Sequence, residues 1–264
     1  MARYIHIGMD PNINIGSFAL SWHWVLSLLA LVVAVYLVQR WAPKWGIPKE
    51  QVRKMAPWVI LGSIVVARVF TLIDTSYSQD PWAFFKLWEG GFATYGAILG
   101  GLLAGGLYAW HKGYRLRRFG DLAAPAIIAA QPIARIGCLI AGDAYGSPTT
   151  WPIGLVYTHP DAHPDALLAS LGVGTHPAVI YEIVWDLAVL AALLMLRGRL
   201  RPEGALFVCY LAMYALGRFL VGIVRENVIV LGGLNAAQII ALALLAVTVP
   251  YLVYRVRFQA RAAW

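Results

Sequence analysis

Seven apolar stretches, each about 20 residues long, restrict this chain to one kind of architecture, because a helix of that length spans the hydrocarbon core of a bilayer. Composition agrees: 60% of the residues are hydrophobic and only 13% are charged, whereas a soluble domain is roughly 25% charged. We predict an all-α, polytopic membrane protein with about seven transmembrane helices in a single transmembrane domain, residues 1–264. The stretches are residues 17–39, 56–74, 91–110, 121–141, 177–196, 204–224 and 235–254.

Lysine and arginine residues gather in alternate loops, after the first, third, fifth and seventh stretches. Loops rich in these residues face the cytoplasm. We therefore predict an external N-terminus, a cytoplasmic C-terminus and, for residues 142–176, an external loop region that forms a small head. The first stretch has no signal-peptide cleavage pattern and is expected to be a retained helix. Because the net charge of +8 is explained by these loops, we expect no nucleic-acid partner.

Three arginines lie inside apolar stretches, where a charge at the bilayer centre costs at least about 2.5 kcal/mol. They either form structural ion pairs with nearby acidic residues or bind an anionic headgroup, since guanidinium binds phosphate through two parallel hydrogen bonds. Arg68 can pair locally with Asp74, six residues later, and we assign it to structure. Arg135 and Arg218 favour an anion site, for which the acidic residues Asp121, Asp143, Glu182 and Asp186 are the competing partners.

Further polar residues recur near the outer ends of the fifth and sixth stretches. Glu182, directly after Tyr181, lies in an otherwise apolar helix, and pairing with an arginine is its simplest explanation. Tyr214 and Arg218 are four residues apart and share a helix face. Arg225 follows two turns later and marks a second depth of the same wall.

Histidines and cysteines give weaker indications of chemistry. His23 lies between two tryptophans near the outer end of the first stretch, and it is either a packing residue or a proton-transfer group. Cys138 and Cys209 lie in apolar stretches without metal-ligand spacing and are interpreted as small buried hydrophobic residues. His159 and His163 of the external loop belong to no regular element that would fix them as ligands. We predict no metal site and no cofactor.

In order and spacing, these blocks resemble the prolipoprotein diacylglyceryl transferase family. The family's signature looks like Gly-Arg-x-Gly-Asn-x-x-Asn-x-Glu-x-x-Gly, and this chain has Arg135, Gly137, Asp143 and Gly146 at the matching positions. The supporting matches are Asp121, the His-Pro-x-x-x-Tyr-Glu block that ends at Glu182, Tyr-x-x-x-Arg-Phe at 214–219, Arg225–Glu226 and Gln238.

The resemblance implies a seven-helix protein of the bacterial cytoplasmic (inner) membrane. Its implied activity is transfer of a diacylglyceryl group from phosphatidylglycerol to the lipobox cysteine thiol of a preprolipoprotein, with release of glycerol 1-phosphate. The implied partners are phosphatidylglycerol, preprolipoprotein signal peptides and membrane lipids. Arg135 and Arg218 would stabilise the departing phosphate. The residues expected to bind substrate are Arg135, Tyr214, Arg225, Tyr181, Glu182 and Gly146.

The chain departs from the family pattern around its polar centre. His23 replaces a family tyrosine and Tyr95 replaces a family histidine, so the two residue types are exchanged between positions. Cys138 and Ala141 replace the signature asparagines, and Asp143 replaces the longer glutamate. We expect His23, Tyr95 and Asp143 to act with the two arginines in catalysis. Since tyrosine is a poor base at neutral pH, His23 is the candidate to take up the thiol proton if it faces Tyr95.

Two other interpretations remain open. A diverged relative would bind anionic phospholipid without catalysis or would use another acceptor, which the loss of both asparagines favours. Pro125 and Pro132 predict a kinked or broken fourth helix, a feature of secondary transporters, although no inverted repeat is visible. Gly90–Gly91 and Gly100–Gly101 flank the third stretch and predict close helix packing.

Overall fold

The computed structural model describes residues 4–16, 18–73, 94–162, 172–227 and 229–258 of the chain. Within this part, long helices overlap all seven predicted stretches. They are α1 (Trp22–Trp41), α2 (Lys49–Ile73), α3 (Thr94–His111), α4 (Leu116–Ala141), α6 (Ala178–Leu196), α7 (Ala205–Val221) and α8 (Ala236–Arg255), with a short 3-10 helix at Ala42–Trp45.

Four segments are long and apolar enough to cross a membrane among the described residues. They are Trp22–Trp45, Leu116–Ala141, Ala178–Leu196 and Ala236–Arg255. The apolar α7 is shorter, at 17 residues. The fold is therefore a helical membrane protein with several spans, and the full count of seven crossings stays a prediction.

The structure is mostly helical, as predicted, and in the described part of the chain four small two-stranded sheets that the sequence did not predict accompany the helices. Short strands satisfy backbone polar groups where the chain leaves the bundle, and their few residues give no periodic pattern in the sequence. The parallel pair is β1 (Ile5–Ile7) with β4 (Leu155–Tyr157). The antiparallel pairs are β2 (Asn12–Ile15) with β3 (Phe18–Ser21), β5 (Leu200–Arg201) with β8 (Arg257–Phe258), and β6 (Ile229–Leu231) with β7 (Leu234–Asn235).

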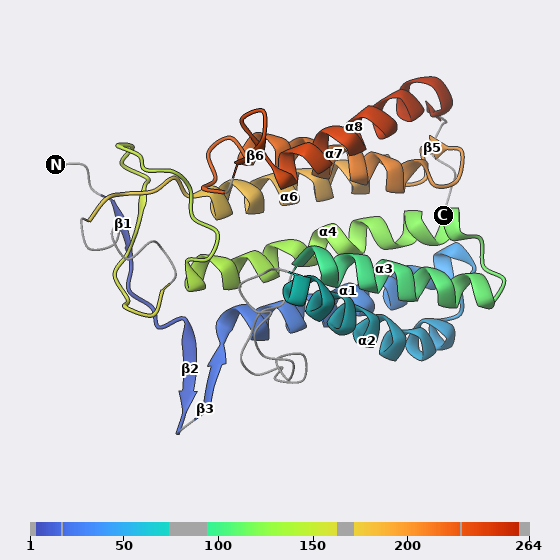
Figure 1. Cartoon of the computed structure of the whole chain (residues 1–264). Helices are drawn as coiled ribbons and strands as arrows, with labels where there is room; N and C mark the ends of the chain where they lie inside the picture. The colour runs from blue at the N-terminus through green and yellow to red at the C-terminus, as the bar shows by residue number, and fades with distance from the viewer. Residues whose placement is uncertain (1–3, 17, 74–93, 163–171, 228, 259–264) are drawn as a thin grey trace.

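The strands divide between the two ends of the helix bundle (Figure 1). At one end, β1 pairs with β4 and so ties the N-terminal segment to the chain between α4 and α6. The hairpins β2–β3 and β6–β7 lie at this end too. The basic loops after α1 and α3, together with β5 and the end of α8, lie at the opposite end.

Helix α4 is the element that the site depends on, because it packs against α1, α6 and α7. Its inward face is fully buried at Leu122, Ala124 and Ile128. The predicted break in this helix is wrong, since α4 runs without interruption through Pro125 and Pro132. Neighbouring helices pack against α4 on several sides where a proline removes one backbone hydrogen bond, and the kink stays a prediction.

Glycines set the spacing between α2 and α3, as predicted for Gly100–Gly101. A Cβ atom on Gly100 would lie 2.1 Å from the carbonyl oxygen of Gly62, so only hydrogen fits between the two backbones. The other predicted pair, Gly90–Gly91, lies outside the described residues.

Candidate functional site

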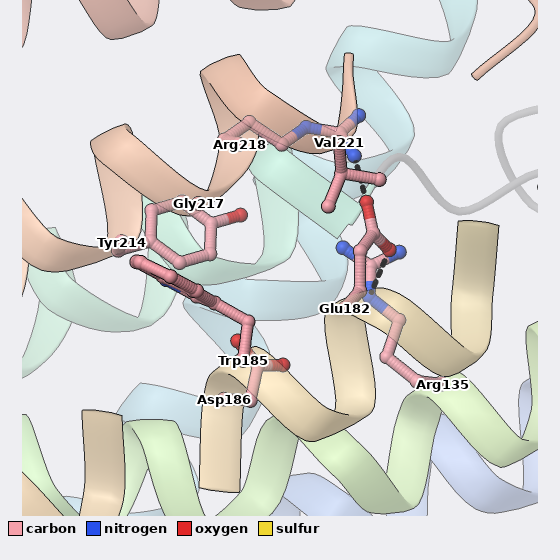
Figure 2. Close-up of a pocket in the computed structure, with 8 residues that line it drawn as sticks. All are labelled: Arg135, Glu182, Trp185, Asp186, Tyr214, Gly217, Arg218 and Val221. Carbon is pink, nitrogen blue, oxygen red and sulfur yellow. Dashed lines mark hydrogen bonds and ion pairs between the residues drawn. The ribbon is translucent and has the colours of Figure 1, made fainter. Parts of the chain in front are cut away.

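Three arginines, from α4, from α7 and from the segment after α7, converge on Glu182 of α6. Figure 2 shows Glu182 with two of them, Arg135 and Arg218. The Nε atom of Arg135 lies 2.9 Å from Oε2 of Glu182. The other carboxylate oxygen, Oε1, accepts a hydrogen bond from Nη1 of Arg218 and lies 3.2 Å from Nη1 of Arg225. The expected pairing of Glu182 with an arginine is therefore confirmed. We call these four residues the arginine cluster.

The arginine cluster is almost closed to solvent. Side-chain exposure is 11% for Arg135, 10% for Arg218, 15% for Arg225 and 7% for Glu182. Three guanidinium groups thus share one carboxylate. Asp186, one turn further along α6, is buried beside them, and among the described residues named here an ionised Asp186 would still leave one more positive than negative charge. Such an excess in an apolar setting favours the binding of an anion.

A small cavity of about 10 Å³ adjoins Arg135, Glu182 and Arg218, with Tyr214 and Trp185 on its other side (Figure 2). This is room for roughly one water molecule. Glycine at position 217 leaves room for the indole of Trp185 beside α7, since a Cβ atom there would lie 2.1 Å from Nε1 of Trp185. That nitrogen donates to the carbonyl oxygen of Met213 at 2.9 Å, which fixes the indole against α7.

Backbone pairing beyond the helices holds Arg225 at the cluster. Gly146 forms an antiparallel bridge with Arg225, and the amide of Ser147 donates to the carbonyl oxygen of Val224 at 2.8 Å. A Cβ atom on Gly146 would lie 2.6 Å from the carbonyl oxygen of His176. Gly146, predicted as a substrate-binding residue, therefore lies where three backbone segments pack closely.

A second group of polar atoms lies where α1 begins and α4 ends. Nδ1 of His23 is 2.5 Å from Oδ2 of Asp143 and 3.8 Å from Sγ of Cys138. The three donor atoms all lie within 4.8 Å of one another. We call His23, Cys138 and Asp143 the His–Cys–Asp cluster.

Local structure explains this convergence. Ser21 caps α1 by accepting a hydrogen bond from the amide of His23, so His23 occupies the first helical turn. Gly137 lets α4 approach that turn, because a Cβ atom there would lie 2.8 Å from Cα of His23. Gly142 ends α4 with φ of 73°, a left-handed conformation that favours glycine and turns Asp143 back toward His23.

The ionisation of Asp143 depends on its burial and on its contact with His23. Burial opposes its ionisation, but the hydrogen bond from His23 and the charge of that ring outweigh burial, so the pKa of Asp143 is lowered. The pKa of Tyr157 is raised, chiefly by burial and to a smaller extent by electrostatic interaction with Asp143 and Cys138. Tyr157 is only 2% exposed, and its hydroxyl has no hydrogen-bond partner among the described residues.

Not every predicted residue joins these clusters. Tyr181 lies on α6 with its hydroxyl 3.5 Å from Nδ1 of His176. Tyr95 belongs to the first turn of α3, but its side chain lies outside the described residues, as does Asp74, the predicted partner of Arg68. The exchange of roles between His23 and Tyr95 therefore stays a prediction.

Sequence reasoning missed several residues of the site. Cys138 was interpreted as a buried hydrophobic residue, and it is buried, but it also contacts His23. Its place in the polar signature, five residues before Asp143, was the available signal. The sequence held no signal for Trp185 and Gly217, because their contact joins two different helices.

Comparison with known proteins gives a consistent result. A family model described as prolipoprotein diacylglyceryl transferase matches residues 12–254. A phosphatidylglycerol–prolipoprotein diacylglyceryl transferase of Gloeobacter violaceus is 37% identical over 237 residues, covering 88% of this chain and 87% of the relative. Proteins with the same name from Dehalococcoides mccartyi and Trichormus variabilis are each 34% identical, covering 96% and 87% of this chain and 96% and 83% of their own lengths.

Proposed function

Because this chain belongs to the prolipoprotein diacylglyceryl transferase family, we propose that it transfers a diacylglyceryl group from phosphatidylglycerol to a cysteine thiol. The acceptor is the lipobox cysteine of a preprolipoprotein, and glycerol 1-phosphate is released. Relatives that match most of the chain carry the name of this activity. The observation that carries the proposal is the arginine cluster, three guanidinium groups gathered on one buried carboxylate among apolar helices.

The reaction requires stabilisation of the negative charge that develops on the departing phosphate. The thiolate sulfur attacks a glycerol carbon, and the carbon–oxygen bond to phosphate breaks with its electron pair moving onto the phosphate. Arg135 and Arg218 stabilise the charge that develops there, and Arg225 holds the headgroup. Glu182 gathers the guanidinium groups at one place before substrate binds.

The small cavity implies how the lipid enters. A phosphate cannot occupy about 10 Å³, so it takes over contacts that Glu182 makes with the guanidinium groups. Tyr214 lines the same cavity and is positioned to contact the headgroup, as predicted from its spacing to Arg218. Tyr181 and Gly146 contribute at the outer end of the site.

The acceptor thiol loses its proton at the pair formed by His23 and Asp143. A thiol of pKa about 8.5 is mostly protonated at neutral pH, and the thiolate is the nucleophile. The 2.5 Å contact with Asp143 orients the His23 ring, as a carboxylate commonly does for a catalytic histidine. Substitution of His23 by alanine and by glutamine tests this role, and full transferase activity in both variants would remove it.

The membrane arrangement belongs to the same proposal. Seven helices cross the bacterial cytoplasmic membrane as one domain, residues 1–264, with the N-terminus outside and the C-terminus in the cytoplasm. Residues 142–176 form the external head. The gathering of basic loops at one end of the bundle supports this orientation (Figure 1). Phosphatidylglycerol and the signal peptide then meet the site from the outer leaflet.

The test is a transfer assay with purified full-length protein, phosphatidylglycerol and a lipobox peptide. We expect glycerol phosphate release that requires the peptide cysteine and is absent with a matched serine peptide. Release without a cysteine requirement would indicate another acceptor. Binding of phosphatidylglycerol without any release would indicate a lipid-binding relative and would refute the proposed activity.

A further inference from the structure

An open groove lies at the basic end of the bundle, between the turn that joins α3 to α4 and the segment that leads into α7 (Figure 1). Its volume is about 610 Å³, within the range of small-molecule sites. Leu116 begins α4 and Arg135 lies about five turns further on, so roughly 28 Å of helix separates the groove from the arginine cluster. Besides Leu116, the lining includes Trp110, Tyr114, Arg115, Arg117, Pro202 and Glu203.

Asp121 holds the two sides of the groove together. Its carboxylate accepts hydrogen bonds from the amides of Gly204, at 2.7 Å, and Phe207, at 2.9 Å, so the start of α7 is tied to the first turns of α4. Gly204 permits this close approach, because a Cβ atom there would lie 3.2 Å from Cβ of Arg117. The groove is therefore bounded by two segments whose backbones are fixed to each other.

The charges of the groove favour an anion. Arg115 and Arg117 bring two guanidinium groups to the lining, against the carboxylate of Glu203. Lys112 and Arg118 add two more cations next to them in the sequence. Arg115 lies 3.7 Å from Glu203 with its side chain 78% exposed, so this pair contributes little and a phosphate can replace it. The first turn of α4 has no acidic residue, so its backbone dipole adds to the positive charge.

An exposed apolar surface continues from the groove along α3. Leu103, Leu107 and Trp110 share one face of this helix and are exposed by 52%, 63% and 69%. Leu116, also exposed, begins α4, which is long and apolar enough to cross a membrane. The groove thus lies where an apolar surface meets a positively charged one, with a tryptophan at the boundary, as is typical of the membrane interface. A ligand that suits both surfaces has a phosphate at one end and acyl chains at the other.

We propose that the groove binds an anionic phospholipid, with its phosphate at Arg115 and Arg117 and its acyl chains along the exposed face of α3. Guanidinium groups suit this ligand because they bind phosphate through two parallel hydrogen bonds. The lipid is not a reactant, since it lies far from the arginine cluster, and it joins the ends of α3 and α4 to the start of α7. The lipid site rests on the groove alone, whereas its assignment to the cytoplasmic leaflet rests on the orientation in the proposed function.

The test counts bound lipids. Full-length protein in detergent micelles is titrated with phosphatidylglycerol, or with phosphatidylcholine as the neutral comparison, and lipids that stay bound are counted by native mass spectrometry. We expect two phosphatidylglycerol molecules per chain, one at the arginine cluster and one at the groove. Replacing Arg115 and Arg117 together by glutamine should weaken one of the two sites roughly 30-fold, about fivefold for each cation near a lipid surface.

Matched variants separate the groove from general surface charge. Arg53 and Lys54 are exposed cations of α2 outside the groove, and replacing both by glutamine removes the same charge but should leave both lipid sites intact. Glu203→Gln removes the carboxylate of the groove and should strengthen the same site several-fold, a gain that misfolding cannot produce. Glycerol phosphate release should persist in the Arg115→Gln/Arg117→Gln variant, because the arginine cluster is unchanged.

Three outcomes would overturn the groove as a lipid site. Equal weakening by Arg115→Gln/Arg117→Gln and by the control pair would mean that surface charge alone attracts the lipid. Equal binding of phosphatidylcholine would mean that the groove does not select an anion. Displacement of the lipid by an equal concentration of free glycerol phosphate would mean that the ligand is a soluble anion. In contrast, binding of a lipid at the groove without any glycerol phosphate release would refute the transferase and leave the groove standing.

Discussion

Replacing Glu182 by glutamine is the sharpest test of the arginine cluster, because it removes a carboxylate that three guanidinium groups share. Glutamine keeps the shape and can still accept a hydrogen bond, so the change is mainly one of charge. The variant leaves three buried cations together. We expect a large loss of stability that an added anion partly restores.

The magnitude follows from distances and burial. At separations near 3 Å and an effective dielectric constant of 20, each arginine–carboxylate attraction is about 5 kcal/mol before desolvation is subtracted. Removing one partner of a buried ion pair costs about 3–5 kcal/mol net. At 7% exposure, water screens Glu182 little, so the full range applies. For a chain of this size that loss lowers the unfolding temperature by roughly 6–20 °C.

The assay is thermal unfolding in detergent micelles, with and without phosphatidylglycerol. Glu50→Gln is the matched control, because Glu50 pairs with Arg53 and Lys54 on the surface at 56% exposure. Exposed pairs contribute about 0–1 kcal/mol, so this control should unfold within a few degrees of the parent protein. Phosphatidylglycerol at about 100 times its Kd adds roughly 2.7 kcal/mol. It should raise the unfolding temperature of Glu182→Gln more than that of the parent, whereas phosphatidylcholine should not.

Two results would refute the reasoning. Equal unfolding temperatures for Glu182→Gln and Glu50→Gln would mean that the carboxylate does not compensate the arginines. Equal protection of Glu182→Gln by phosphatidylglycerol and phosphatidylcholine would mean that the cluster does not select an anion. Either result would leave the buried positive charge without its assigned partner.

Three further changes test single contacts. Arg218→Lys removes two-pronged phosphate binding, and glycerol phosphate release should fall about 10²–10³-fold in kcat/KM with folding intact. Gly217→Ala forces a methyl group against Nε1 of Trp185, so thermal unfolding should show a loss of about 1–3 kcal/mol, whereas Gly106→Ala, with open space, should show none. Asp121→Ala removes the acceptor for two amides at the start of α7 and should cost about 1–3 kcal/mol in the same measurement; unchanged stability would contradict a capping role.

The helices and the arginine cluster were predictable, because exposed backbone polar groups and unpaired charges both cost free energy inside a bilayer. Stretches of about 20 apolar residues have few alternatives in lipid, and each overlaps a helix of the structure. Arg135 and Glu182 were predictable for the same reason, since an isolated charge in an apolar helix requires a partner.

The remaining features depend on contacts between distant segments. The parallel pairing of β1 with β4 joins residues about 150 positions apart and leaves no periodic pattern. By local rules, the two prolines of α4 predicted a break in the helix. The helix is nevertheless continuous, because it packs against α1, α6 and α7. The His–Cys–Asp cluster joins the first turn of α1 to the end of α4, and no spacing rule connects residue 23 with residue 138.

In the proposed mechanism, helix α4 joins both halves of the reaction in one site. Arg135 contributes to the arginine cluster, and Cys138, three residues later, lies about 4.5 Å further along the same helix axis. Displacement at carbon requires the attacking sulfur and the departing oxygen on opposite sides of that carbon. If Arg135 binds the phosphate and His23, which Cys138 contacts, takes the thiol proton, one continuous helix fixes that separation more firmly than two loops would. Both residues lie after Pro125 and Pro132, so the spacing between them depends on the last turns of α4, which run without interruption to Ala141.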